Sequence, residues 1–352
     1  MIRVGLVGFG LAGRVFHAPL ISSVEGLELA AVVERSSDKA AALYTEIKTY
    51  RTLEELLADA SIKLVVVATP NDTHFDLAMQ ALEAARNVVI DKPMSTTSAQ
   101  IAELMELAGG IGLQLVPFHN RRWDSDFQTV QNVLHEKKMG QLVHFESTID
   151  RWRPGSSTRA WKEDPEQGGL LLDLGTHIVD QALVLFGVPE SVGAEIRHER
   201  SNGEAPDSFT LRLNYFTGVS VVLSANCLSS LPRPRFHLRG TKGNFCKWGV
   251  DPQEEALGKI TRIESADWGT EPSNLWGMLS VDTDGSVVTE PVSPIAGDYR
   301  RFYAGVRDAL LGTAPSPVSA VDAWRAARVL EYALESAKSH RDIECDWSAE
   351  PS

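Results

Sequence analysis

The sequence predicts an α/β protein with an N-terminal doubly wound parallel sheet and a C-terminal α+β domain whose large, open-faced sheet is mostly antiparallel. Three observations support this fold class. The 352-residue length exceeds what one hydrophobic core usually organises. Short β-branched apolar runs alternate with helical segments as far as Phe118, and from about His119 the strand patterns alternate with period two instead. We therefore expect two domains, at residues 1–119 and 120–352.

The first domain shows the pattern of parallel βαβ units. Helical spacing of apolar residues predicts helices over 75–85 and 101–108, the second entered through a capping box of Thr97 and Gln100. The apolar runs predict strands at 2–7, 27–33, 64–68, 88–90 and 113–118.

The second domain has one helical stretch near 174–185 and then strands that alternate. Residues 209–215 place apolar side chains on one face and Thr210, Arg212 and Asn214 on the other, and 219–225 returns antiparallel through a turn at Thr217-Gly218. A long helix over 320–338 carries one apolar stripe. Because an open apolar sheet face often associates with a second subunit, we expect a homodimer or homotetramer formed through this sheet.

Composition narrows the function class. The formal net charge of −13 disfavours nucleic acid and anionic lipid as partners. No apolar run approaches the roughly 20 residues that cross a bilayer, and the chain begins directly with a strand, so we expect a cytoplasmic protein without a signal peptide. The three cysteines lack CxxC spacing, and we interpret them as structural thiols: Cys227, Cys246 and Cys345.

A glycine-rich loop joins the first strand to a helical segment, and this context predicts a dinucleotide site. Gly8 permits the tight turn, Gly10 allows a pyrophosphate to approach the backbone, and Gly13 permits close packing of helix on strand. The cofactor-binding residues predicted here are Gly8, Phe9, Gly10, Leu11, Ala12 and Gly13.

The end of the second strand bears on the choice of cofactor. Glu34 stands where a carboxylate accepts hydrogen bonds from the adenine-ribose hydroxyls, which favours NAD. Arg35 and Ser36 follow it, and a guanidinium beside a hydroxyl suits a 2′-phosphate, so the signals conflict. We predict NAD(P), with a lean to NAD from Glu34.

Two further segments follow strands at the same predicted sheet edge. Thr69, Pro70, Asn71 and His74 are candidate cofactor contacts, although the alternative is a capping turn in which Asp72 or Thr73 simply starts a helix. Asp91-Lys92-Pro93 ends a later strand and brings Lys92 within reach of the nicotinamide; the proline makes a cis peptide possible.

Asp173 and His177 are four apart in a predicted helix and would share one face, which Asp180 and Gln181 continue. A carboxylate beside an imidazole sets its tautomer and raises its pKa, as a base for an alcohol proton requires. Lys92, Asp173 and His177 form the predicted catalytic group. The alternative is a structural ion pair. We assign no metal, because Asp173 and His177 lack a third ligand at a recognisable spacing.

The glycine loop, Asp91-Lys92-Pro93 and the Asp173…His177 stretch occur in the order found in the glucose–fructose oxidoreductase/inositol dehydrogenase (Gfo/Idh/MocA) family, which the chain resembles over essentially its whole length. Within that family it is most similar to the branch that contains NADP-dependent scyllo-inositol dehydrogenases. The supporting stretches are 10–20, 69–74, 118–127 and 249–254.

The resemblance implies a Rossmann dinucleotide domain, a catalytic group of Lys92, Asp173 and His177, and oligomers formed through the open sheet. It implies that Asp91 contacts the cofactor, with a shorter reach than the more usual glutamate. It also implies a sugar or polyol as substrate and places four residues in the substrate cleft, each with a structural salt bridge as the alternative: Arg121, Arg122, Trp123 and Asp124. His119 is a further candidate, and Arg153 and Trp161 would cap the cleft with a donor and an apolar plate suited to a sugar face.

Three functions remain open from the sequence: an NAD(P)-dependent dehydrogenase acting on CH–OH donors, a redox-assisted glycosidase that holds NAD tightly, and a cofactor-sensing regulator without turnover. Retention of Lys92, Asp173 and His177 argues against the regulator, because a sensor needs the glycine loop but no acid/base group. The dehydrogenase is the function we predict.

Overall fold

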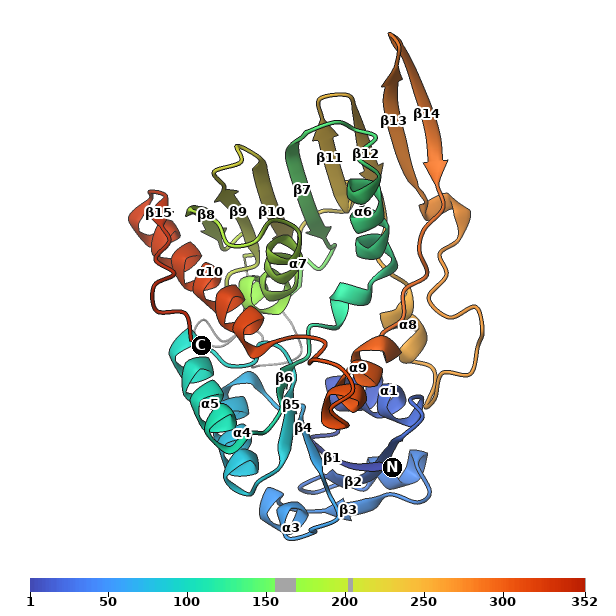
Figure 1. Ribbon diagram of the computed structural model, residues 1–352, viewed down its shortest axis with the longest axis vertical. Helices are drawn as coiled ribbons and strands as arrows, with labels where there is room; N and C mark the ends of the chain where they lie inside the picture. The colour runs from blue at the N-terminus through green and yellow to red at the C-terminus, as the bar shows by residue number, and fades with distance from the viewer. Residues whose placement is uncertain (156–168, 202–204, 352) are drawn as a thin grey trace.

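The first sheet is parallel throughout, and it lies in the N-terminal part of the chain (Figure 1). A computed structural model describes residues 1–155, 169–201 and 205–351. In these residues the sheet has the strand order β3 (Lys48–Tyr50), β2 (Leu27–Val33), β1 (Ile2–Val7), β4 (Leu64–Val67), β5 (Asn87–Ile90) and β6 (Leu115–Pro117). The five predicted strands are confirmed to within two residues at each end, and β3 was missed because a polar three-residue strand shows no apolar run.

Helices cover both faces of this sheet, which explains why its strands are apolar without alternation. In β4, Leu64 and Val66 belong to one buried cluster, whereas Val65 and Val67 belong to another on the opposite face. The helical elements of this part of the chain are η1 (Gly13–His17), α1 (Ala18–Ser22), α2 (Lys39–Leu43), α3 (Leu53–Leu57), η2 (Asn71–Thr73), α4 (His74–Glu83) and α5 (Ser98–Ile111). The Thr97 side chain accepts a hydrogen bond from the Gln100 amide, so it caps α5 as predicted.

The second sheet is larger and mostly antiparallel. Its order is β14 (Ser286–Val292), β13 (Gly277–Thr283), β12 (Gly243–Lys247), β11 (Phe236–Gly240), β7 (Leu142–Asp150), β10 (Ser220–Asn226), β9 (Ser208–Asn214), β8 (Ser191–Arg197) and β15 (Ile343–Glu344). Strands β7 and β10 are parallel neighbours, and β9 and β10 pair antiparallel with Leu211 opposite Leu223. The predicted hairpin is therefore confirmed.

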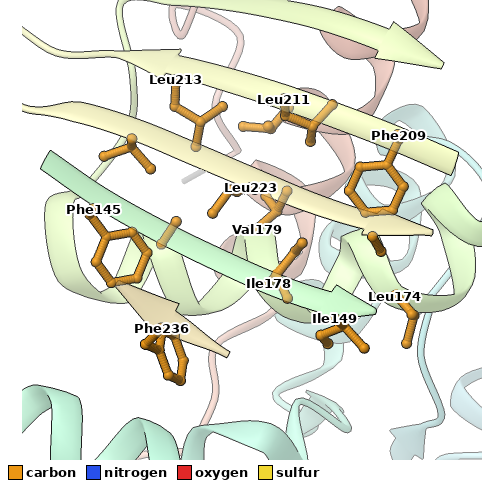
Figure 2. Close-up of a cluster of buried hydrophobic side chains, with 14 of the residues drawn as sticks. Phe145, Ile149, Leu174, Ile178, Val179, Phe209, Leu211, Leu213, Leu223 and Phe236 are labelled. Carbon is orange, nitrogen blue, oxygen red and sulfur yellow. The ribbon is translucent and has the colours of Figure 1, made fainter. Parts of the chain in front are cut away.

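One face of this sheet carries the second core. Figure 2 shows apolar side chains of β7, β9 and β10 gathered against Ile178 and Val179 of α7 (Thr176–Phe186). Among the described residues after 119, the other helical elements are η3 (Asn120–Trp123), α6 (Ser125–Glu136), η5 (Leu171–Gly175), α8 (Gln253–Leu257), η6 (Ser273–Leu275), α9 (Arg300–Leu310) and α10 (Ala320–Ser339).

The opposite face of the second sheet is mostly polar, although Val222 and Met278 also lie on it, which corrects the expectation of an apolar open face. Its side chains occupy the alternate positions of the strands, for example His144 and Glu146 of β7 and Arg212 of β9. The apolar-patch argument for subunit association therefore does not hold, and the homo-oligomer stays a prediction from the family resemblance.

The last third of the chain connects the two sheets. Tyr299, Phe302 and Tyr303, at the start of α9, are fully buried in the cluster that contains β1 and α1. Trp324 of α10 is buried in the cluster that contains α4 and α5. Along the described residues, no helix combines the length and the hydropathy that crossing a membrane requires.

Candidate functional site

A cleft of about 1540 Å³ runs along the carboxyl edge of the parallel sheet and ends against the second domain. The glycine loop and the ends of β2, β4 and β5 form its sheet side. Asp173, His177, Arg151 and Glu254 line it from the second domain. This is the position at which open α/β sheets bind their ligands, at the switch in strand order between β1 and β4.

The glycine loop has the shape that the sequence predicts. Gly8 has a φ of +96°, a conformation that favours glycine, and a Cβ there would lie 2.6 Å from the Ala68 carbonyl oxygen. A Cβ on Gly13 would lie 2.1 Å from the Gly8 carbonyl oxygen, so Gly13 allows the helix to pack on the loop. At Gly10 a Cβ would meet no atom within 4 Å, among the residues described, because this position faces the cleft. Phe9, Leu11 and Ala12 also line the cleft.

Glu34 lines the cleft, but its carboxylate is engaged by its own loop. One oxygen accepts from the Ser37 hydroxyl at 2.6 Å and from the Lys39 amide at 3.2 Å, and the other accepts from the Ala40 amide at 2.8 Å. The residue is 6% exposed. The carboxylate therefore stabilises the start of α2, and these contacts speak against its predicted role as a ribose ligand. Arg35 and Ser36 line the same end of the cleft and are exposed.

The segment after β4 contains residues that fit a cofactor contact and a residue that has a structural role. Thr69, Pro70 and Asn71 line the cleft, as a cofactor contact requires. His74 does not: it is fully buried, and its ring nitrogens lie 2.8 Å from the Pro93 carbonyl oxygen and 2.9 Å from that of Thr69. His74 therefore holds two cleft-wall segments together, and its prediction as a cofactor contact is wrong.

Lys92 meets the second domain at the end of β5. Its ammonium donates to the Asp173 carbonyl oxygen at 2.6 Å and to a carboxylate oxygen of Asp173 at 2.9 Å. The Lys92–Pro93 peptide is cis. Asp173 lies in η5, a π-helical turn that leads directly into α7, and such turns are frequent at functional sites. The predicted convergence of Lys92 and Asp173 on one cleft is present.

His177 lies on the first turn of α7 in the same cleft wall and is 6% exposed. Burial lowers its pKa well below the ordinary value of 6.5, and the positive charges of Lys92 and Arg121 lower it further. Asp173 raises the pKa only weakly, since its carboxylate lies 2.9 Å from the Lys92 ammonium and 3.7 Å from the Arg151 guanidinium. The sequence expectation of a raised pKa is therefore wrong in sign, and the imidazole is neutral at neutral pH.

Asp91 lines the cleft beside Lys92 and is supported by groups that the sequence did not assign to the site. Its carboxylate lies 3.7 Å from Nε2 of His17, and Nδ1 of His17 lies 2.6 Å from the Tyr303 hydroxyl. Burial raises the pKa of Asp91, but His17 and Lys92 outweigh burial and hold the pKa below its ordinary value. His17 lies one helical turn past the glycine loop, and this position is the sequence feature that could have identified it as part of the site.

Of the segment 119–124, the predicted substrate residue that lines the cleft is Arg121. It donates to Asp124 at 3.1 Å and to Glu254 at 2.7 Å. His119, Arg122, Trp123 and Asp124 do not line the cleft and are corrected to supporting roles. Asp124 accepts from the buried Tyr299 hydroxyl, and Trp123 packs edge-on against Phe302.

The other two corrected residues lie behind the wall near His177. Arg122 forms a two-pronged contact with Asp180, at 2.9 and 2.6 Å, and a second ion pair with Asp322 at 3.1 Å. His119 is 2% exposed, and burial lowers its pKa. The charged segment 119–124 therefore indicated the position of a site. Most of its charged side chains, however, form ion pairs behind the cleft wall and do not line the cleft.

Arg153 lines the cleft as predicted, together with Arg151. Trp161 lies outside the described residues, as do Arg159 and Ala160. Cleft residues that the sequence did not single out are Asn120, Arg200, Asp207 and Glu254. Arg200 pairs with Asp207 at 2.6 Å.

The residues present fit a dinucleotide. Gly10 leaves room for a pyrophosphate against the backbone, and the chain becomes helical directly after it, which directs amide hydrogens toward an anion. Lys92 and His177 stand at the end of the cleft formed with the second domain, where a nicotinamide extended from this loop would lie.

Comparison with known proteins gives the same assignment. Residues 2–119 match the model of the oxidoreductase family NAD-binding Rossmann fold (GFO_IDH_MocA), and residues 132–345 match the model of that family's C-terminal alpha/beta domain. The uncharacterized oxidoreductase YdgJ of Escherichia coli is 39% identical over 98% of both chains. The scyllo-inositol 2-dehydrogenase (NADP(+)) IolW of Bacillus subtilis is 31% identical over 97% of this chain and 95% of its own.

A solved structure shows that the resemblance extends to the fold. The Yersinia pestis protein YPO2259 superposes with a TM-score of 0.93 at 41% identity, covering 98% of this chain and 97% of that one. Two family models that together cover most of the chain and a relative aligned over nearly all of it leave one conclusion: the chain belongs to the Gfo/Idh/MocA family of oxidoreductases.

Proposed function

We propose that the protein transfers a hydride between NAD(P) and a CH–OH carbon of a sugar or cyclic polyol of the inositol type. One observation carries this proposal: Lys92 and His177 come from different domains and line the same end of a dinucleotide-sized cleft. The name of IolW, a scyllo-inositol 2-dehydrogenase, supports a polyol as the substrate class.

The residues divide the proton chemistry between them. When bound, NAD(P) supplies or accepts the hydride. The Lys92 ammonium, held by two oxygens of Asp173, keeps a hydrogen available for the substrate oxygen and stabilises the negative charge that develops there during oxidation. The neutral His177 imidazole accepts the hydroxyl proton, since its pKa lies well below 6.5 and leaves the ring unprotonated at neutral pH.

The imidazolium that forms is unstable next to Lys92 and Arg121, so it releases its proton readily to solvent before the next alcohol binds. In the reverse direction the same ring donates the proton. Asp173 is a positioning residue in this scheme, because its two oxygens fix the Lys92 ammonium.

For the cofactor we propose a preference for NADP, which revises the lean to NAD. The Glu34 carboxylate, the group that would bind both ribose hydroxyls, accepts three hydrogen bonds within its own loop. The Arg35 guanidinium and the Ser36 hydroxyl are exposed at the same end of the cleft and suit a 2′-phosphate.

A panel of inositols, aldoses and ketoses, each assayed by nicotinamide absorbance with NAD and NADP separately, tests the proposal. We expect turnover with at least one cyclic polyol or sugar and a higher kcat/KM with NADP. Dinucleotide binding without turnover of any CH–OH donor would overturn the dehydrogenase and favour a sensor. Cleavage of a glycoside without net change in reduced cofactor would favour the redox-assisted glycosidase.

A further inference from the structure

The polar face of the second sheet carries two histidines and a glutamate in adjacent positions, away from the cleft. His144 and Glu146 are two apart on β7, so both side chains lie on the face opposite the buried Phe145. His237 of β11 is paired directly with Glu146 in the antiparallel register. The three side chains therefore share one patch on the same side of the sheet.

The possible ligand atoms of these three side chains lie somewhat further apart than they would around a bound metal ion. An Oε atom of Glu146 lies 4.0 Å from Nε2 of His144 and 3.9 Å from Nδ1 of His237, and the three atoms all lie within 4.8 Å of one another. These distances are longer than the donor–acceptor distance of a hydrogen bond. Ligands bound at about 2.0–2.1 Å in a tetrahedron are roughly 3.4 Å apart, so binding requires each Glu146 contact to shorten by about half an ångström and the two histidine nitrogens to approach by about 1.4 Å at most.

Neighbouring groups leave these three atoms available. The other ring nitrogen of His144 lies 3.4 Å from the Ser220 hydroxyl, an outer contact that directs Nε2 toward Glu146. Arg233 is held by both carboxylate oxygens of Asp150, at 3.0 and 2.9 Å, and it lies 3.7 Å from the other carboxylate oxygen of Glu146. Arg239, paired with His144, is exposed and has room to turn into solvent.

We propose that His144, Glu146 and His237 bind a divalent transition-metal ion such as Zn²⁺, with water in the remaining coordination position. Two imidazoles and one carboxylate form the donor set that zinc accepts with an open fourth position, whereas magnesium and calcium prefer oxygen ligands alone. None of the three residues lines the dinucleotide cleft, so this site is separate from the proposed dehydrogenase activity.

Isothermal titration of Zn²⁺ into tag-free protein, after dialysis against EDTA and then metal-free buffer, tests the site. We expect one ion per chain, and we expect His144→Ala, His237→Ala and Glu146→Gln each to weaken binding by at least about 10- to 100-fold, the loss typical for a residue that merely supports a ligand. His135→Ala is the matched control, since His135 is an exposed histidine at the end of α6, and it should bind Zn²⁺ as the unmodified protein does.

Circular dichroism and NADPH binding of each variant establish that it is folded, because none of the three residues lies in the cleft. Absence of Zn²⁺ binding by the unmodified protein would overturn the proposal. Binding that survives in the folded His144→Ala/His237→Ala double variant would overturn it as well, since the ion would then be held elsewhere.

Discussion

The Lys92 ammonium lies 2.9 Å from a carboxylate oxygen of Asp173, although 81 positions separate the two residues in the chain. The pair joins the edge of the parallel sheet to the turn that precedes α7. The Asp173 carboxylate is therefore shared with a cation from the first domain, and Arg151 lies 3.7 Å from its other oxygen. The pKa of His177 is lowered first by burial and then by the nearby positive charges of Lys92 and Arg121, and Asp173 offsets these effects only in part.

The first prediction concerns the pH dependence of alcohol oxidation. The basic form of His177 is the neutral ring, and a lowered pKa preserves that form to lower pH. We therefore expect the acid limb of the kcat/KM profile to lie below pH 6.5, the ordinary value for histidine. A profile measured from pH 4.5 to 9 on the substrate that the panel identifies checks this. An acid limb above pH 6.5 that disappears in His177→Ala would contradict the assignment of a depressed pKa.

The glycine loop offers a variant that separates binding from folding. Gly10→Ala places a methyl group in open space toward the cleft, so we expect the thermal midpoint to change by about 2 °C or less while the dinucleotide Kd rises about tenfold or more. Gly109→Ala, also without a neighbour for the added Cβ among the described residues but located in α5, is the control. Equal dinucleotide affinities for the two variants would mean that the pyrophosphate does not approach Gly10.

Arg35 tests the cofactor preference. If its guanidinium binds the 2′-phosphate, Arg35→Ala loses a charge-assisted contact worth about 1.5–3 kcal/mol with NADPH and nothing comparable with NADH. Fluorescence titration should show NADPH affinity falling by about 10- to 100-fold and NADH affinity changing by less than about threefold. Arg262→Ala, an exposed arginine outside the cleft, is the control. Equal losses for the two cofactors in Arg35→Ala would exclude phosphate recognition by Arg35.

A buried ion pair provides a stability prediction independent of function. The Lys247 ammonium lies 2.6 Å from the Glu271 carboxylate, and both side chains are fully buried. Glu271→Gln leaves an uncompensated buried ammonium, so we expect a loss of about 3–5 kcal/mol in the free energy of unfolding by urea. Glu255→Gln removes the exposed partner of Lys259 and should cost less than about 1 kcal/mol. Similar losses in both variants would show that burial does not set the cost.

Much of the fold could be predicted from the sequence, because its signals are local. The apolar runs of β1 and β2 and the hairpin of β9 and β10 follow directly from residue periodicity. The polar strand β3 could not be found, since Lys48–Tyr50 pairs with β2 at the sheet edge and contains no apolar run. Arg212 and Asn214 already indicate a polar open sheet face, in conflict with the expectation of an apolar interface.

The site residues could be predicted where a residue type has one usual role at its position in the fold. They could not be predicted where the side chain can bond either to a ligand or to another group of the protein. Gly8, Lys92 and His177 line the cleft as their positions indicate. Glu34 and His74 also occupied predicted positions, but backbone groups of neighbouring segments engaged their side chains. Spacing along a chain cannot show which of several polar neighbours a side chain will choose.

In the proposed mechanism Lys92 and His177 act on the same hydride-transfer step. Single-turnover hydride transfer, followed by nicotinamide absorbance with the substrate that the panel identifies, measures this directly in Lys92→Met, His177→Ala and the control Lys63→Met, which changes an exposed lysine. We predict rates about 10²- to 10⁴-fold lower in the first two variants, with dinucleotide Kd within about threefold of the unmodified protein and no change in the control. Rates within threefold of the unmodified protein in folded Lys92→Met and His177→Ala would contradict the account.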